Sequence, residues 1–179
     1  MEIIHLRHAQ RNPNHKHINQ KGLEKSQKIG SKLKNFDLVL TSVSTRAVET
    51  CIAMGYTIDD TIDFSLSTKE IKSPQIEMKE GSTYQEYFEE YKKQEYIYRF
   101  ANNCKKIIIE KLKEFSLNEK HKVLLISHGG VIESSTIAFL PSTDFKLFGK
   151  GTSNCEGVKL IIDGNYDGIQ GEPIRFILD

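Results

Sequence analysis

Short apolar runs recur along the chain, and polar residues bound each of them. The runs Ile3–Leu6, Asp37–Leu40 and Val123–Ile126 predict buried strands, because they are short and rich in aliphatic side chains. Two further strands are predicted near the end of the chain, at about Gly157–Asp163 and Ile174–Leu178. Both lie next to Gly, Asn and Asp residues that favour turns.

Helices are predicted in the segments between these strands, although the periodicity of the first one is weak. Asn19 is placed to cap a helix over about Gln20–Lys34. A second helix is expected where Ala47, Cys51 and Met54 recur at helical spacing, and Gly55 is expected to end it. The strongest amphipathic pattern predicts one long helix, whose apolar positions step by three or four residues: Ile97, Ala101, Cys104, Ile108, Leu112 and Phe115.

The middle of the chain has a weaker pattern. Residues 56–80 mix Asp, Ser, Thr and Pro with scattered apolar side chains, so we expect an irregular insertion there. Ser82–Gln85 has the spacing of a capping box and is expected to open a helical stretch. A last helix is expected to run from Gly130 to Leu140.

Strands alternate with helices for most of the chain, and this order predicts the fold class. We expect an α/β fold, a three-layer α/β/α sandwich with a largely parallel central sheet. A length of 179 residues favours one domain over residues 1–179, with residues 56–100 as an irregular and helical insertion over the active site. In such sheets, ligands bind outside the carboxyl ends of the strands.

Composition excludes several classes of partner. The net charge of +1 gives no global field that would attract nucleic acid or a membrane surface. No apolar run approaches the ~18 residues of a membrane span, and the N-terminus has no signal-peptide pattern. The three cysteines form no CxxC pair, which favours a reducing, cytoplasmic location and a role as small apolar core residues. The sequence leaves the oligomeric state open.

Candidate chemistry gathers at three predicted strand ends. Arg7 and His8 follow the first strand, Arg46 follows the second, and His128 follows the third together with two glycines. Arginine presents a planar fork of donors that matches phosphate oxygens, and helix N-termini add free N–H groups. The arrangement predicts a dianion site that contains candidate nucleophiles.

These residues stand in motifs that resemble the histidine phosphatase superfamily, the phosphoglycerate-mutase-like proteins. The likeness rests on four segments in order: Leu6–Gln10 with Asn14, Asn19–Gly22, Asp37–Ser42 with Arg46–Thr50, and Leu124–Ile132. Asn154, before the last strands, fits the same pattern. The likeness covers the chain except for residues about 56–100. Ala9 departs from it, since the family usually has glycine there, and Arg11 stands where threonine or serine is frequent.

The resemblance implies a role for each matching residue. His8 is expected to be the nucleophile that accepts the phosphoryl group. Arg7, Arg46 and His128 are expected to hold the three equatorial oxygens, and Asn14 is expected to add a donor. A bound dianion would favour protonation of His128 as a third cation.

The resemblance also implies a carboxylic acid that protonates the leaving oxygen and later activates water. The family takes this acid from the segment after the second motif. Glu77 is the first candidate, because it precedes Gly81 by four residues as the family acid often precedes a glycine. Glu70 and Glu80 are the second and third candidates.

The expected function is a metal-independent phosphatase that hydrolyses a small phosphomonoester through a phosphohistidine, with no cofactor. His15 and His17 lie in a polar loop without cysteine or carboxylate neighbours, and they are weak metal ligands. Two alternatives stay open. One is a phosphotransferase of the phosphoglycerate mutase type, for whose longer insertions this chain has little room. The other is a non-catalytic module that binds a phosphorylated ligand.

Overall fold

The computed structural model describes residues 1–33, 35–65 and 81–176, and its centre is one six-stranded sheet. The strand order is β3-β2-β4-β1-β5-β6. The first four strands in that order are parallel to one another, and β5 and β6 extend the sheet as antiparallel strands. The strands are β1 (Glu2–Arg7), β2 (Leu38–Ser42), β3 (Asp60–Ile62), β4 (Lys122–Ser127), β5 (Gly157–Ile162) and β6 (Gly168–Ile174). A mostly parallel sheet between helices confirms the predicted fold class.

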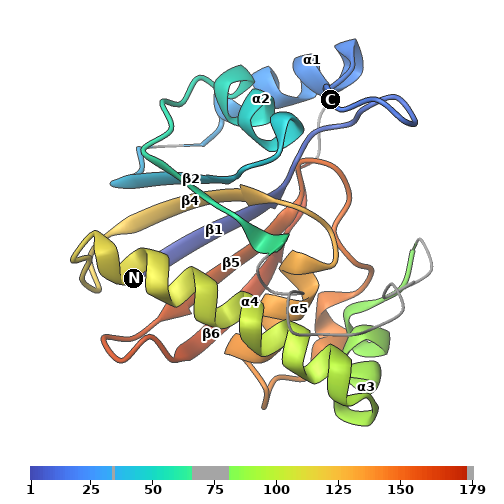
Figure 1. Ribbon diagram of the computed structural model, residues 1–179, viewed down its shortest axis with the longest axis vertical. Coiled ribbons are helices and arrows are strands. Elements are labelled where there is room, and N and C mark those ends of the chain that lie inside the picture. The colour runs from blue at the N-terminus through green and yellow to red at the C-terminus, as the bar shows by residue number, and fades with distance from the viewer. Residues whose placement is uncertain (34, 66–80, 177–179) are drawn as a thin grey trace.

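Helices cover both faces of this sheet (Figure 1). One face carries α1 (Gln20–Gly30) and α2 (Thr45–Ala53). The other carries α3 (Tyr84–Lys93), α4 (Glu95–Glu114), α5 (Val131–Phe139) and the short 3₁₀ helix η2 (Phe145–Phe148). Each face has its own cluster of buried apolar residues, so the sheet is packed on both sides. None of the helices in the described part of the chain is long and apolar enough to cross a membrane.

Local sequence signals explain two of these helices well. Asn19 caps α1 by accepting a hydrogen bond from the backbone N–H of Gly22 at 2.9 Å, as its position predicts. The five apolar residues that α4 buries step by four, three, four and four positions: Ile97, Ala101, Cys104, Ile108 and Leu112. Phe115, the sixth residue of the predicted pattern, is the C-terminal cap of α4 and is 36% exposed.

Other predicted elements differ from the structure. The helix expected to reach Lys34 ends at Gly30, and residue 34 lies outside the described part. The capping box belongs to Thr83 and Glu86 rather than to Ser82 and Gln85, because Thr83 is the residue with extended backbone at the helix start.

Two strands, near the middle and the end of the chain, also differ from the prediction. The strand β3 lies inside the segment expected to be irregular, where it pairs with β2. The last strand, β6, precedes the expected position and ends at Ile174, because its register is set by antiparallel pairing with β5. Residues 66–80 and 177–179 lie outside the described part of the chain.

The order of the strands brings distant segments to one edge of the sheet. Strands β1 and β4 pair in parallel, with Arg7 opposite Ser127, and β2 pairs with the other side of β4. The carboxyl ends of β1, β4 and β2 therefore meet at the same edge. The residues that follow these three strands are the ones with the candidate chemistry.

Candidate active site

His8 directly follows β1 and is hydrogen-bonded to the last residue of β4. Its backbone N–H donates to the Ser127 carbonyl at 2.9 Å. Its ring is buried, and the centroid of that ring lies 5.3 Å from the centroid of the His128 ring. The two imidazoles expected to share a site therefore lie side by side.

The His8 ring has a defined tautomer. Its Nδ1 lies 2.8 Å from the carbonyl oxygen of Ala9, and a carbonyl can only accept, so Nδ1 carries the proton. The other nitrogen, Nε2, accepts a hydrogen bond from Nε of Arg46 at 2.9 Å. Nε2 is thus the unprotonated nitrogen, and its lone pair points toward a guanidinium.

Arg46 lies in the first turn of α2, and its guanidinium connects both rings. Beside its bond to His8, its Nη2 lies 3.2 Å from Nδ1 of His128. Nε2 of His128 lies 2.8 Å from the Ser42 hydroxyl at the end of β2. Since the guanidinium only donates, Nδ1 of His128 accepts and Nε2 of His128 donates to Ser42.

Both imidazoles are neutral near pH 7 in this environment. Burial is the main cause that lowers the pKa of His8 from 6.5 to about 4; the hydrogen bond to Ala9 opposes it, and nearby guanidiniums, led by Arg46, lower the pKa further. Burial followed by the charge of Arg46 lowers the pKa of His128 to about 3. The described residues around His128 therefore favour its neutral form.

The backbone around His8 is fixed from two sides. The N–H of Ala9 donates to the Thr50 hydroxyl at 2.8 Å, and that hydroxyl donates to the Arg46 carbonyl at 2.6 Å. The side-chain amide of Asn154 donates to the His8 carbonyl at 3.0 Å. Ala9 is fully buried within one of the two apolar clusters.

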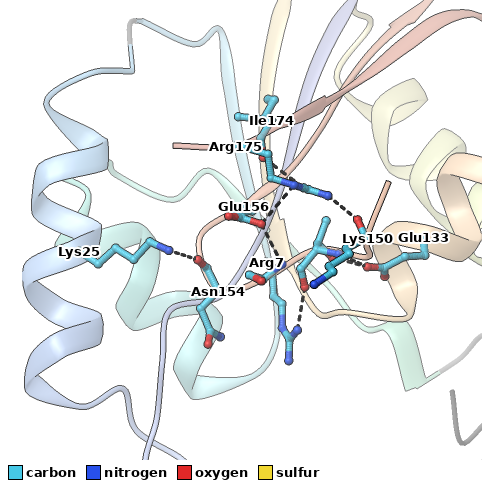
Figure 2. A network of polar contacts seen from close by, with 10 residues as sticks. Arg7, Lys25, Glu133, Lys150, Asn154, Glu156, Ile174 and Arg175 are labelled. Carbon is cyan, nitrogen blue, oxygen red and sulfur yellow. Dashed lines mark hydrogen bonds and ion pairs between the residues drawn. The ribbon is translucent and has the colours of Figure 1, made fainter. Parts of the chain in front are cut away.

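Arg7 is oriented by the loop that precedes β5 (Figure 2). Its Nη1 donates to the Thr152 carbonyl at 2.8 Å. Its backbone carbonyl accepts from the backbone N–H of Cys155 at 3.0 Å. Its guanidinium also packs on Gly129, where an added Cβ would lie 3.2 Å from the Arg7 carbon that carries the three nitrogens. Nε of Arg7 is buried and has no hydrogen-bond partner among the described residues. Donors of the Arg7 fork thus remain for an anion.

The structure brings some of the predicted site residues together and leaves others apart. Arg7, His8, Arg46 and His128 come together at one edge of the sheet, and Asn154 supports His8. Asn14 is exposed in a left-handed backbone conformation, and no hydrogen bond within the described part of the chain joins it to the site. The three candidate acids Glu70, Glu77 and Glu80 lie outside the described residues.

The residues considered as metal ligands lie apart from one another or at the surface. Within residues 1–33, 35–65 and 81–176, no cluster of three or more His, Cys, Asp or Glu has the geometry to hold a metal ion. His17 pairs with Glu49 at 2.5 Å and is exposed at the surface. The three cysteines are buried, in keeping with their predicted role as core residues.

Sequence reasoning missed three residues that support the site. Thr50 was part of a motif, but its bond to Ala9 spans 41 positions. Thr152 stands in a glycine-containing loop without local periodicity. Glu133 follows Gly130 at capping-box spacing, and this spacing was the one signal that would have pointed to it.

Comparison with known proteins agrees with the geometry. The family model described as histidine phosphatase superfamily (branch 1) matches residues 3–170. The chain belongs to the histidine phosphatase superfamily. A comparison with curated protein sequences found no significant match.

Several solved structures share the fold. A phosphoserine phosphatase from Entamoeba histolytica, in complex with 3-phosphoglyceric acid, is 14% identical, with a TM-score of 0.66 and coverage of 98% of this chain and 97% of that chain. A mycobacterial glucosyl-3-phosphoglycerate phosphatase is 14% identical, with a TM-score of 0.63 and 96% coverage of both chains. A phosphoglycerate mutase from Bacillus anthracis is 16% identical, with a TM-score of 0.60 and coverage of 98% and 92%. At these identities the likeness concerns the fold.

Proposed function

We propose that this protein is a metal-independent phosphatase that hydrolyses a small phosphomonoester through a phosphohistidine on His8. The observation that carries the proposal is the state of the His8 ring. Its Nδ1–H is held by the Ala9 carbonyl, and its unprotonated Nε2 faces Arg46 at 2.9 Å. A neutral, oriented imidazole beside fixed cations is what phosphoryl transfer requires of a nucleophile.

Binding of the substrate would change the partners of Arg46. The guanidinium that donates to both rings would donate to phosphoryl oxygens instead, and Arg7 would add its remaining donors. Two guanidiniums balance the charge of a phosphomonoester dianion. His128, beside that dianion, would take up a proton and become a third donor.

The reaction would then follow two displacements. The Nε2 lone pair of His8 forms the N–P bond while the P–O bond of the ester breaks. A carboxylic acid, for which Glu77 is the first candidate and Glu70 and Glu80 are the alternatives, gives its proton to the leaving oxygen. In the second step the same carboxylate takes a proton from water, water attacks phosphorus, and the N–P electrons return to Nε2 as phosphate leaves.

The test is hydrolysis of p-nitrophenyl phosphate by a His8→Ala variant. We expect no turnover at any pH, and intact-mass measurement after rapid acid-free quenching should show a phosphoryl adduct in the wild type only. The matched control is His121→Ala, because His121 precedes β4 at the opposite end of the strand from His128. Substantial residual turnover in His8→Ala would contradict the proposed nucleophile.

The mutase alternative has its own assay. With 3-phosphoglycerate and a trace of 2,3-bisphosphoglycerate, a phosphatase releases inorganic phosphate, whereas a mutase forms 2-phosphoglycerate. We expect release of phosphate to be the faster reaction. Isomerisation faster than release would favour the mutase, and tight binding of phosphate without either reaction would favour a binding module.

A further inference from the structure

A buried carboxylate in α5, that of Glu133, stands next to the site but takes no part in the proposed reaction. Its side chain is 2% exposed. It accepts hydrogen bonds from the backbone N–H of Thr152 at 2.6 Å, from the Thr152 hydroxyl, and from the backbone N–H of Gly130 at 2.5 Å. Burial of a carboxylate costs free energy unless its oxygens are bonded, and here neutral donors satisfy them.

Arg7 contacts the same two segments from the other side. The Thr152 N–H points to Glu133, and the Thr152 carbonyl accepts from Arg7 at 2.8 Å. The backbone N–H of Gly130 donates a hydrogen bond to Glu133, and the neighbouring Gly129 packs on the Arg7 guanidinium. Figure 2 shows the contacts of Glu133 and Arg7 meeting on the loop that passes Lys150.

Electrostatics agree with this placement. The pKa of Tyr87 is raised to about 12, chiefly by burial, and the charge of Glu133 raises it while the charge of Arg7 lowers it. The Tyr87 ring also lies 3.6 Å from where a Cβ on Gly151 would be. The two opposite charges thus act on one small region between α3 and the loop.

The hydrogen bond to Thr152 is the one bond that the Arg7 guanidinium makes to another described residue. Its direction therefore depends on where the Thr152 carbonyl lies, and Glu133 fixes that residue at both its N–H and its hydroxyl. We propose that Glu133 is a positioning residue that aims the Arg7 guanidinium at the phosphoryl group through Thr152. This inference rests on the proposed function, because it assigns Arg7 to the substrate.

A double-mutant cycle tests the proposal. We expect Glu133→Gln to lower kcat/KM for p-nitrophenyl phosphate about tenfold in the wild-type background. In the Arg7→Ala background the same change should lower it less than twofold, because the group that Glu133 positions is already absent. A purely structural role would give equal losses in both backgrounds, and that result would overturn the proposal.

A second variant and a control guard against loss of folding. Thr152→Val removes the hydroxyl and keeps the shape, and it should reproduce part of the loss with the same dependence on Arg7. The control is Ser135→Ala. Ser135 lies on the same helix, is fully buried, and donates a hydrogen bond from its hydroxyl to the Ile132 carbonyl. This variant should leave kcat/KM unchanged. If Thr152→Val has the same effect with and without Arg7, the proposal is wrong.

Failure of the proposed function gives a different result. If the wild type turns over no phosphomonoester, the phosphatase is rejected, and the cycle is measured by calorimetry with inorganic phosphate. Glu133→Gln should then weaken phosphate binding about tenfold only when Arg7 is present. Unchanged phosphate affinity in Glu133→Gln would overturn the positioning role by itself.

Discussion

Arg46 connects both imidazoles of the site, so its replacement tests the site most directly. Its Nε donates to His8 at 2.9 Å and its Nη2 donates to His128 at 3.2 Å. Arg46→Gln removes the charge and most of the fork. Arg46→Lys keeps the charge but presents one nitrogen where arginine places two. The pair therefore separates the contribution of charge from the contribution of geometry.

The size of each effect follows from the bonds that are lost. Loss of a charged donor to a developing oxyanion costs about 3–4 kcal/mol, so Arg46→Gln should lower kcat about 10²–10³-fold. Loss of one of two charged hydrogen bonds costs about 1.5–3 kcal/mol, so Arg46→Lys should lower it about tenfold to a hundredfold. Both activities are measured with p-nitrophenyl phosphate.

The two variants should also differ in the titration of His8. Burial is the main cause of its low pKa of about 4, and among the charges that lower it further Arg46 is the first. Arg46→Gln should therefore raise the pKa of His8, and Arg46→Lys should leave it low. NMR titration of the His8 ring measures this pKa directly. The pH dependence of activity would not, because phosphomonoesters themselves take up a proton at a pH of about 6.

The control is Arg99→Gln, because Arg99 lies on the surface of α4 in an exposed pair with Glu95. It should leave both activity and the pKa of His8 unchanged. A kcat of Arg46→Gln within threefold of the wild-type value would refute the role of the Arg46 charge. Full activity of Arg46→Lys would refute the role of the fork geometry.

Three further predictions concern stability and metal dependence. Burial lowers the pKa of His8 to about 4, and the pKa values of His5 and His128 to about 3. As the pH falls below 6.5, these histidines take up protons in the unfolded chain but not in the folded protein. The free energy of unfolding should therefore fall toward pH 4, by about 3 kcal/mol for His8 alone. Equal free energies of unfolding in urea at pH 7 and pH 4.5 would contradict this. Gly22→Ala should destabilise the fold by about 1–3 kcal/mol, because its Cβ would lie 2.3 Å from the Gln10 carbonyl oxygen; an unchanged Tm would rule out this close contact. EDTA should leave turnover intact, because two arginines supply the positive charge at the phosphoryl group; a loss restored by a divalent ion would contradict the mechanism.

Local sequence determined which chemistry stands at which strand end. Three short aliphatic runs are each followed by residues able to bind an anion or to attack phosphorus, and the structure keeps those runs as β1, β2 and β4. The Asn19 cap and the periodicity of α4 were equally readable, because both depend on residues three or four positions apart. Patterns between residues three or four positions apart can be recognised without knowledge of the fold.

Elements set by distant contacts could not be predicted in the same way. The strand β3 has three residues and forms because β2 offers it a parallel edge. The limits of β6 follow from its antiparallel register with β5. Thr83 rather than Ser82 caps α3, and Thr83 also bridges to Lys150 across the fold. A period of two or 3.6 residues contains no information about such partners.

The sequence by itself thus determined the fold class and the identity of the residues at the carboxyl ends of the strands. Tertiary structure decided their relation: β4 lies between β1 and β2, which brings the rings of His8 and His128 to 5.3 Å. It also decided their protonation, because burial and the guanidinium of Arg46 lower both pKa values, and a backbone carbonyl selects the nitrogen of His8 that keeps its lone pair. The bond from His8 to Ala9 is local, but the contacts of Arg46 with both rings arise only when segments 38 and 82 positions apart in the sequence pack together.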